Sequence, residues 1–220
     1  MYDNIFDEIF VTFSRELERR GIALPSVSEI AGEDNDPYRI LVSTILSLRT
    51  KDKVTIERSK ALFEKAKNVY ELYAMDSTEL AETIKPSAFY KRKAENLKEI
   101  AKIIIEKYDG KIPSTMEDLL SLPGVGMKTA SLTLNLGFNE LAICVDCHVH
   151  QILNRIGIIS TKNPDESEKE LRKILPKKYW IPLNEVLVSY GQGICKSVSP
   201  LCSECPYEKK CKKIGVDKHR

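Results

Sequence analysis

The sequence has little net charge and no long apolar run. Its 220 residues carry 34 basic and 32 acidic side chains, for a formal net charge of +2. Charge must be clustered to create a strong local field, so this balance does not by itself indicate a polyanionic partner. Apolar residues make up 42% of the chain, which is enough for one extended core or two modest ones. None of the apolar stretches is long enough to predict a membrane span.

Export signals, repeats and low-complexity linkers are also missing from the sequence. The first residues, MYDNIFDEIFVTFSRELERRG, alternate acidic and apolar side chains and lack the basic lead and apolar stretch of a secretory signal. This pattern predicts a cytoplasmic protein. The chain has only two glutamines, Gln151 and Gln192, among many lysines and glutamates, which favours a thermophilic source.

Basic residues do gather near the C-terminus. From Cys205 onward the chain holds six basic side chains and only two acidic ones. The basic residues are Lys209, Lys210, Lys212, Lys213, Lys218 and Arg220, and the acidic ones are Glu208 and Asp217. A solvated tail explains this pattern about as well as a nucleic-acid contact does.

Nearly every segment has the periodicity of a helix rather than that of a strand, which predicts an all-α fold. A stripe of apolar residues marks a first helix that ends at Gly21, namely Ile5, Ile9, Phe10, Phe13 and Leu17. Asp36 and Pro37 predict the start of a second helix, and a third follows from about Asp52.

Two capping boxes predict further helix starts, at residues 76–79 (DSTE) and 114–117 (STME). In such a box the first side chain and the glutamate satisfy exposed backbone N–H groups. Between the boxes, a long amphipathic helix runs from Tyr90 to Tyr108 and is closed by Gly110.

Four of the six cysteines lie together near the C-terminus. Six, two and five residues separate Cys195, Cys202, Cys205 and Cys211. A set of thiolates this close in sequence can hold either a tetrahedral zinc ion or an iron-sulfur cluster. Only one CxxC pair is present, whereas the common zinc pattern has two, so a cluster is the favoured prediction. A disulfide pair or four inert thiols is the alternative that explains the spacing least well.

A glycine-rich bend between two short helices is predicted at residues 119–130, LLSLPGVGMKTA. Gly124 and Gly126 allow backbone N–H groups to come close to an oxyanion, and the helix that follows adds its partial positive charge. Pro123, Gly124, Val125 and Gly126 therefore predict a DNA-phosphate contact. The alternative is an ordinary tight turn between packed helices.

Three motifs together resemble the endonuclease III family of helix-hairpin-helix DNA glycosylases: LPGVGMKTA, then VDCHVHQILNRIG at residues 145–157, then the C-x6-C-x2-C-x5-C tail. The resemblance extends over residues 37–211. It implies two lobes with the substrate cleft between them. One lobe is a six-helix barrel domain with the helix-hairpin-helix, at residues 28–139. The other is a discontinuous domain, residues 1–27 and 140–220, that binds a 4Fe-4S cluster through the four cysteines.

The same resemblance assigns the catalytic residues. Lys128 stands where bifunctional members of the family carry their catalytic amine. An amine attacks only when it is neutral, and the partial positive charge of a helix N-terminus disfavours the ammonium form. Asp146 matches the carboxylate of the family and is expected to stabilise the cationic sugar and help to move the proton of the lysine. The alternatives are a phosphate contact for Lys128 and an N-cap for Asp146.

Other residues are expected to contact DNA. The segment KPSAFYKRKAEN resembles the intercalating loop of the family, which places Phe89 in the base stack and Lys91, Arg92 and Lys93 near phosphates. Tyr90 is expected in the core. The loop that begins at Lys196 is expected to lie against the DNA backbone.

The sequence departs from the family pattern at three positions. Arg49 replaces a glutamine that contacts the orphan base, and it could prefer guanine there, contact a phosphate or pair with Asp52. Ala88 replaces a glycine before the wedge. Cys147 replaces a threonine, and it and Cys144 are expected to be small buried residues.

The predicted function is that of a bifunctional DNA glycosylase and AP lyase in base excision repair. It would remove damaged, oxidised pyrimidines from duplex DNA through a Lys128 Schiff base and β-elimination, as a monomer associated with the nucleoid. One alternative is a glycosylase for uracil or thymine opposite guanine. The other is a non-catalytic helix-hairpin-helix module with a structural zinc.

Overall fold

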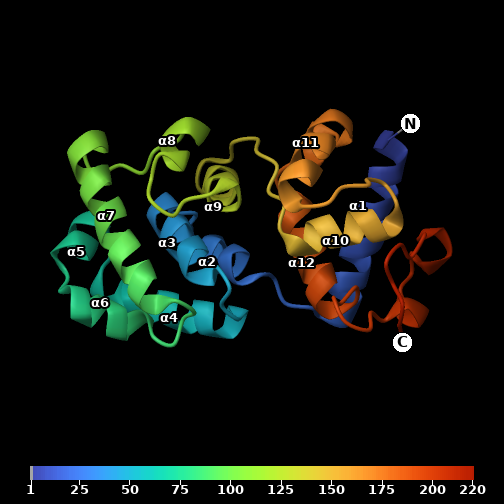
Figure 1. The fold of residues 1–220 in the computed structure, drawn as a ribbon, viewed down its shortest axis with the longest axis horizontal. Coiled ribbons are helices and arrows are strands. Elements are labelled where there is room, and N and C mark those ends of the chain that lie inside the picture. The colour runs from blue at the N-terminus through green and yellow to red at the C-terminus, as the bar shows by residue number, and fades with distance from the viewer. Residues whose placement is uncertain (1) are drawn as a thin grey trace. The chain divides into compact units, whose positions relative to one another are not determined.

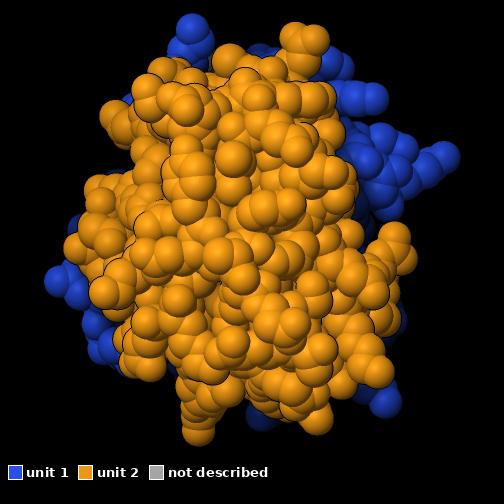
Figure 2. Space-filling model, turned by 90° about the vertical axis from the view of Figure 1, so that its left-hand side faces the viewer, with its two compact units in different colours: residues 1–25, 141–220 blue, residues 26–140 orange. Residues whose placement is uncertain are grey.

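The computed structural model describes residues 2–220, and these form two compact units (Figures 1 and 2). The hairpin unit is Ser26–Glu140. The cysteine unit joins the chain up to Pro25 with Leu141–Arg220. The chain thus passes between the units after residues 25 and 140, where the sequence predicted a division after residues 27 and 139.

All regular elements in residues 2–220 are helices, which confirms the predicted all-α fold. No helix in this part of the chain is long and apolar enough to cross a membrane. The hairpin unit holds α2 (Ser26–Asp34), α3 (Pro37–Ser47), α4 (Asp52–Lys65), α5 (Val69–Ala74), α6 (Ser77–Ile84), α7 (Tyr90–Tyr108), α8 (Met116–Leu120), α9 (Met127–Leu132) and the π-helical turn η1 (Thr133–Gly137).

Helix α3 is the centre of the hairpin unit. It packs against α2, α4, α7, α9 and η1, and it is buried around most of its circumference. A helix that is apolar on nearly all sides is stable only when other elements surround it. The helices that carry the hairpin and the candidate DNA contacts are therefore arranged around one fixed core element.

Side-chain caps begin several helices where the sequence predicted them. Asp36 accepts a hydrogen bond from the N–H of Tyr38 at the start of α3, and Asp76 caps α6. The predicted box at residues 114–117 is displaced by one residue, because Thr115 caps α8 and accepts from the N–H of Asp118. Helix α2 was not predicted from the sequence.

The cysteine unit holds α1 (Tyr2–Arg20), α10 (Cys147–Ile156), α11 (Pro164–Ile174), η2 (Lys177–Tyr179), α12 (Pro182–Gly193), η3 (Cys202–Glu204) and η4 (Glu208–Lys210). Helix α12 packs against both α1 and α10. Phe13 of α1 stacks on Tyr190 of α12 with ring centroids 3.7 Å apart, and Tyr207 approaches Phe13 edge-on at 5.9 Å. The first helix thus shares a core with the segment that carries the four cysteines.

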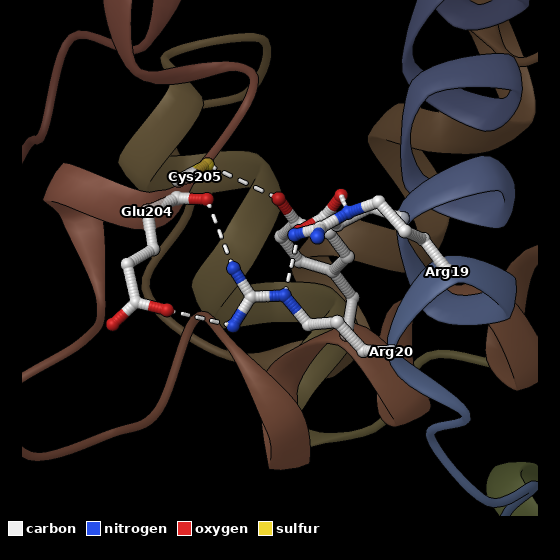
Figure 3. A network of polar contacts seen from close by, with 6 residues as sticks. Arg19, Arg20, Glu204 and Cys205 are labelled. Atoms are coloured by element: carbon white, nitrogen blue, oxygen red, sulfur yellow. Dashed lines mark hydrogen bonds and ion pairs between the residues drawn. The ribbon is translucent and has the colours of Figure 1, made fainter.

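Ionic contacts fasten the end of α1 to the cysteine-bearing loop (Figure 3). The guanidinium of Arg20 donates to Glu204 at 2.9 Å and to Glu16 at 2.6 Å. Arg19 donates to both carboxylate oxygens of Glu16. Hydrogen bonds from Arg19, which make the largest contribution, and from Arg20 lower the pKa of Glu16 to about 2. Residues far apart in the sequence therefore fix the position of the loop around Cys205.

Candidate active site

The glycine-rich bend joins α8 to α9 in the hairpin unit. Gly124 has a φ of +73°, a left-handed conformation that glycine adopts without strain. The N–H of Val125 donates to the carbonyl of Leu122 at 3.2 Å, and both side chains are buried. Gly126 caps α9 without a side-chain bond, and no atom beyond its immediate chain neighbours lies within 4 Å of the place where a Cβ would stand. The backbone at Gly126 is therefore open to approach by a partner.

Lys128 is the second residue of α9 and is half-buried. The next three side chains, Thr129, Ala130 and Ser131, are buried in the unit. The first turn of α9 is therefore held by packing behind it, while Lys128 remains partly accessible. This is the placement that a positioned nucleophile requires.

Asp146 caps α10 in the cysteine unit. Its carboxylate accepts hydrogen bonds from the N–H groups of His148 at 2.8 Å and Val149 at 3.0 Å. The residue is only 8% exposed. Asp146 is therefore the N-cap of α10, and two backbone N–H groups hold its carboxylate at a fixed position.

The four clustered cysteines line one cavity in the cysteine unit, and apolar side chains such as Ile152, Ile156 and Ile194 line it with them. Burial raises the pKa values of the thiols of Cys195, Cys202 and Cys211, which disfavours their thiolate forms. In residues 2–220, no three His, Cys, Asp or Glu side chains are grouped to hold a single metal ion.

Three of the four sulfur atoms have hydrogen-bond donors beside them. Arg155 lies 3.5 Å from Cys195 Sγ, the hydroxyl of Tyr190 lies 3.1 Å from Cys205 Sγ, and the N–H of Lys213 donates to Cys211 Sγ at 3.4 Å. Donors of this kind stabilise thiolates that ligate a metal. The cysteines and the donors beside them therefore fit a metal centre that is held by thiolates.

Arg155 also fixes the loop that follows Cys195. Its buried guanidinium donates to the carbonyls of Lys196 at 2.8 Å and Ser197 at 3.0 Å. The side chain of Lys196 is half-exposed, and Val198 beyond it is 84% exposed. The role of Arg155 could not be predicted from the sequence, since an arginine on an amphipathic helix is ordinarily solvated.

Two exposed side chains of the hairpin unit lie next to each other. Arg49, in the loop between α3 and α4, lies over the ring of Phe89 at 5.8 Å from the centroid. Both residues have positive φ, 55° and 57°, which is uncommon for residues other than glycine. Phe89 is 64% exposed, although it is a large apolar residue. Arg49 and Phe89, which were predicted from separate sequence motifs to contact DNA, thus lie beside each other in the structure.

The basic residues after Phe89 do not share one environment. Lys91 and Arg92 are exposed, as a phosphate contact requires. The prediction that Lys93 also lies near phosphates is wrong, because Lys93 is only 6% exposed and donates to groups inside the unit. Tyr90 is half-buried, with the ammonium of Lys85 5.8 Å from its ring centroid.

The two cysteines outside the set differ from each other. Cys144 is buried, as predicted, but Cys147 is exposed at the first position of α10, so the prediction of a buried residue is wrong there. Among the tail lysines, Lys213 pairs with Glu208 at 2.8 Å and Lys210 pairs with Glu8. Part of the basic cluster is therefore neutralised within the cysteine unit.

Comparison with known proteins identifies the family. The model of the HhH-GPD superfamily of base excision DNA repair proteins matches residues 42–177. Endonuclease III of Thermotoga maritima is 45% identical over 179 residues, 81% of this chain and 84% of the relative.

Two solved structures are similar to this fold. One is a non-covalent endonuclease III–DNA complex, with a TM-score of 0.82, 29% identity, and coverage of 94% of this chain and 95% of that one. The other is a trapped endonuclease III–DNA covalent intermediate, with a TM-score of 0.77, 31% identity, and coverage of 85% and 92%. The chain therefore belongs to the endonuclease III family, and the predicted family is confirmed.

Proposed function

We propose that this chain, a base excision DNA glycosylase and AP lyase of the endonuclease III family, removes oxidised pyrimidines from duplex DNA through Lys128. The observation that carries the proposal is the position of Lys128 in the first turn of the helix after the glycine bend. A trapped covalent intermediate with DNA is known for a structural relative of this chain. A primary amine is the group that can form such an intermediate with a sugar.

Lys128 supplies the nucleophile in this account. Its neutral amine attacks C1′ of the damaged nucleoside, the C1′–N bond breaks, and the base leaves with the bonding electron pair and takes up a proton. The sugar ring then opens: the C1′–O4′ bond breaks, O4′ takes up a proton that the lysine nitrogen gives up, and an iminium link joins Lys128 to C1′. This iminium acidifies the C2′–H bond, loss of that proton expels the 3′ phosphate, and the strand is cut. Water then releases Lys128 from the sugar.

Asp146 supplies fixed negative charge. Because its carboxylate is held by two backbone N–H groups, it does not need to reorganise when positive charge develops on the sugar. We assign it the stabilisation of that charge and the transfer of the proton that Lys128 must lose before attack.

The glycine bend, Arg49 and Phe89 supply the contacts with duplex DNA. The backbone N–H groups of Gly124 and Gly126 bind a phosphate, with Pro123 and Val125 fixing the shape of the bend. Phe89 fills the space left by the extruded nucleotide, and Arg49 contacts the base opposite the lesion. Lys91 and Lys196 add phosphate contacts, which set the affinity rather than the choice of lesion.

A 4Fe-4S cluster is proposed on Cys195, Cys202, Cys205 and Cys211. The lined cavity and the donors beside three of the sulfur atoms support this assignment. When bound, the cluster would supply structural cross-linking, since base removal requires no redox step. This chain's own residues then hold the loop that begins at Lys196 in place against the DNA backbone.

The test is an excision panel under single-turnover conditions. Duplexes carrying thymine glycol, uracil opposite guanine, thymine opposite guanine, or a bare abasic site are incubated with the protein, and the cleaved ends are analysed. The proposal expects fastest excision of thymine glycol, with a β-elimination product at the 3′ end. If uracil and thymine opposite guanine are instead excised fastest, the protein is a mismatch glycosylase and the proposed preference for oxidised pyrimidines is wrong.

The choice of opposite base is tested separately. Arg49→Gln should alter the ratio of excision opposite guanine to excision opposite adenine, because an arginine donates bidentately to guanine and a glutamine does not. A colourless zinc protein that binds these duplexes and cleaves none of them would instead be a non-catalytic module.

A further inference from the structure

Lys93 is a buried lysine whose ammonium group donates hydrogen bonds to three uncharged oxygen atoms. It lies on the inner face of α7 and is 6% exposed. Its Nζ donates to the carbonyl of Leu46 at 2.7 Å, the carbonyl of Leu48 at 2.8 Å and the hydroxyl of Thr50 at 3.0 Å. Three donors thus meet three acceptors, which uses the full capacity of an ammonium group.

Two of the three acceptors of Lys93 belong to the loop that carries Arg49, and the third, the carbonyl of Leu46, lies in the last turn of α3. The Leu48 carbonyl and the Thr50 hydroxyl come from the residues on either side of Arg49. Arg49 itself has a positive φ of 55°, a conformation that persists in a residue other than glycine only when its surroundings hold it. Lys93 therefore holds the residues on both sides of Arg49, whose backbone conformation is strained.

The same group reaches the loop that carries Phe89. The Thr50 hydroxyl, which accepts from Lys93, also accepts from the N–H of Ala88 at 3.1 Å. Ala88 directly precedes Phe89, whose φ is also positive, 57°. One ammonium group and one hydroxyl thus connect the Arg49 loop, the Phe89 loop and α7, and the guanidinium of Arg49 lies over the ring of Phe89.

An ammonium is a costly choice for a buried position. Burial lowers the pKa of Lys93 to about 8, which reports how strongly this site disfavours the charge. Its neighbours on the inner face of α7 are apolar, namely Ala94, Leu97, Ile100, Ala101 and Ile104. An apolar side chain would suit that face equally well, so packing alone gives no reason for a lysine here.

We propose that Lys93 is a positioning residue that holds Arg49 and Phe89 in a fixed arrangement. Arg49 is then placed to contact the base opposite the lesion, and Phe89 to fill the space that the extruded nucleotide leaves in the base stack. The inference rests on the proposed function in that Arg49 and Phe89 are taken to contact DNA. Lys93 itself touches no DNA in this account. It sets where the two side chains stand before DNA binds, which lowers the entropy lost on binding.

The test compares Lys93→Met with Lys98→Met. Lys98 is a matched control because it also lies on α7 and also donates to backbone carbonyls, but these are the carbonyls of Tyr73 and Met75 at the end of α5. We expect Lys93→Met to lower kcat/KM on duplex lesions by about 10-fold to 100-fold, the scale of a small misplacement of a positioning group. The preference for the opposite base should shrink, and Lys98→Met should change neither quantity.

A double-mutant comparison separates positioning from a general loss of stability. In an Arg49→Ala/Phe89→Ala background, Lys93→Met should have no further effect on kcat/KM, because the side chains that it positions are gone. If Lys93→Met costs the same factor in both backgrounds, the positioning role is wrong. An unchanged opposite-base preference in the single variant would overturn it as well.

Hydrogen exchange distinguishes failure of this inference from failure of the proposed function. Exchange in peptides covering residues 47–51 and 85–90 should rise in Lys93→Met and not in Lys98→Met. A rise in exchange can accompany wild-type excision by the Arg49→Ala/Phe89→Ala variant. In that case the DNA contacts assigned to those two residues are wrong, but Lys93 still holds the two loops. If exchange does not rise, Lys93 does not hold the loops and the inference is wrong.

A second variant covers the case in which Lys93→Met does not fold. Thr50→Val removes the hydroxyl that links Lys93 to Ala88 and keeps the shape of the side chain. It should shift the opposite-base preference and the exchange of residues 85–90 in the same direction, with a smaller loss of kcat/KM. No change in either measurement would contradict the proposed link.

Discussion

The two units carry their candidate functional residues in opposite ways. In the hairpin unit, Arg49 and Phe89 are exposed on loops, with backbone conformations that are costly for such residues. In the cysteine unit, the carboxylate of Asp146 is buried in a helix cap, and the four cysteines line an interior cavity. In the hairpin unit these side chains are exposed and available to a partner. In the cysteine unit the carboxylate and the four sulfur atoms are held in place by the surrounding protein. Substitutions at Arg49 and Phe89 should therefore affect binding and selectivity, whereas those at Asp146 and the four cysteines should affect charge stabilisation or folding.

The largest effect is expected for loss of a cluster cysteine. Cys205→Ser should abolish visible absorption and lower the unfolding temperature of the cysteine unit, since structural metal sites contribute on the order of 10 kcal/mol to folding. Cys147→Ser is the matched control, because Cys147 is exposed and outside the set. Absorption spectra and thermal unfolding check both variants. Retained colour in Cys205→Ser would contradict the ligand assignment.

Two substitutions of Asp146 distinguish the role of its negative charge from its role as a helix cap. Asparagine is as good an N-cap as aspartate, so Asp146→Asn should change the free energy of unfolding by less than about 0.5 kcal/mol, whereas Asp146→Ala should cost about 1 kcal/mol. Both should lower single-turnover excision by about 10²-fold to 10⁴-fold, because both remove the carboxylate. Wild-type excision by Asp146→Asn would show that the residue is a cap and nothing more.

The glycine bend offers a pair of substitutions with different consequences. Gly124→Ala places a Cβ 2.4 Å from the amide of Asn96 at a positive φ, so it should cost about 1–2 kcal/mol of stability. Gly126→Ala meets no neighbour and should leave stability unchanged while weakening duplex binding about 10-fold, because the Cβ keeps a phosphate from the backbone. Unfolding and binding at one fixed salt concentration test the pair. Wild-type binding by Gly126→Ala would refute the phosphate contact.

The smallest effect is expected at the link between α1 and the cysteine-bearing loop. The Glu16 pKa in the folded state, about 2, lies below its ordinary value of 4.5. The stabilisation is therefore complete above pH 4.5 and is lost as the pH falls toward 2. Glu16→Gln should cost about 1–2 kcal/mol at pH 7, and progressively less below pH 4.5. Glu18→Gln, on the exposed side of the same helix, should show no such trend in pH-dependent unfolding.

Much of the fold could be predicted from local signals. Asp36 with Pro37 and the DSTE box mark helix starts because their side chains satisfy backbone N–H groups whatever the tertiary context. The apolar stripe between Tyr90 and Tyr108 gave the bounds of α7. Helix α2 was missed because SVSEIAGED carries few apolar residues, and its burial is decided by α3 and α4, against which it packs.

The candidate site was less predictable where it depends on packing between distant segments. Three consecutive basic residues, Lys91, Arg92 and Lys93, look alike in sequence, yet only Lys93 is buried. A helical signal was present, because Lys93 lies four and seven residues before Leu97 and Ile100 on the buried face. Its partners at residues 46–50 and the contact between Arg49 and Phe89 could be found only from the fold.

The most direct test of the account is chemical trapping on lesion-bearing duplex DNA. Wild-type protein is incubated with a thymine glycol duplex in the presence of borohydride, and the adduct is digested and sequenced by mass spectrometry. We expect a stable protein–DNA bond at Lys128, absent in Lys128→Ala, while thermal unfolding of that variant stays like that of the wild type. Active, colour-bearing protein that forms no adduct, or an adduct on another residue, would contradict the assignment of Lys128 as the nucleophile.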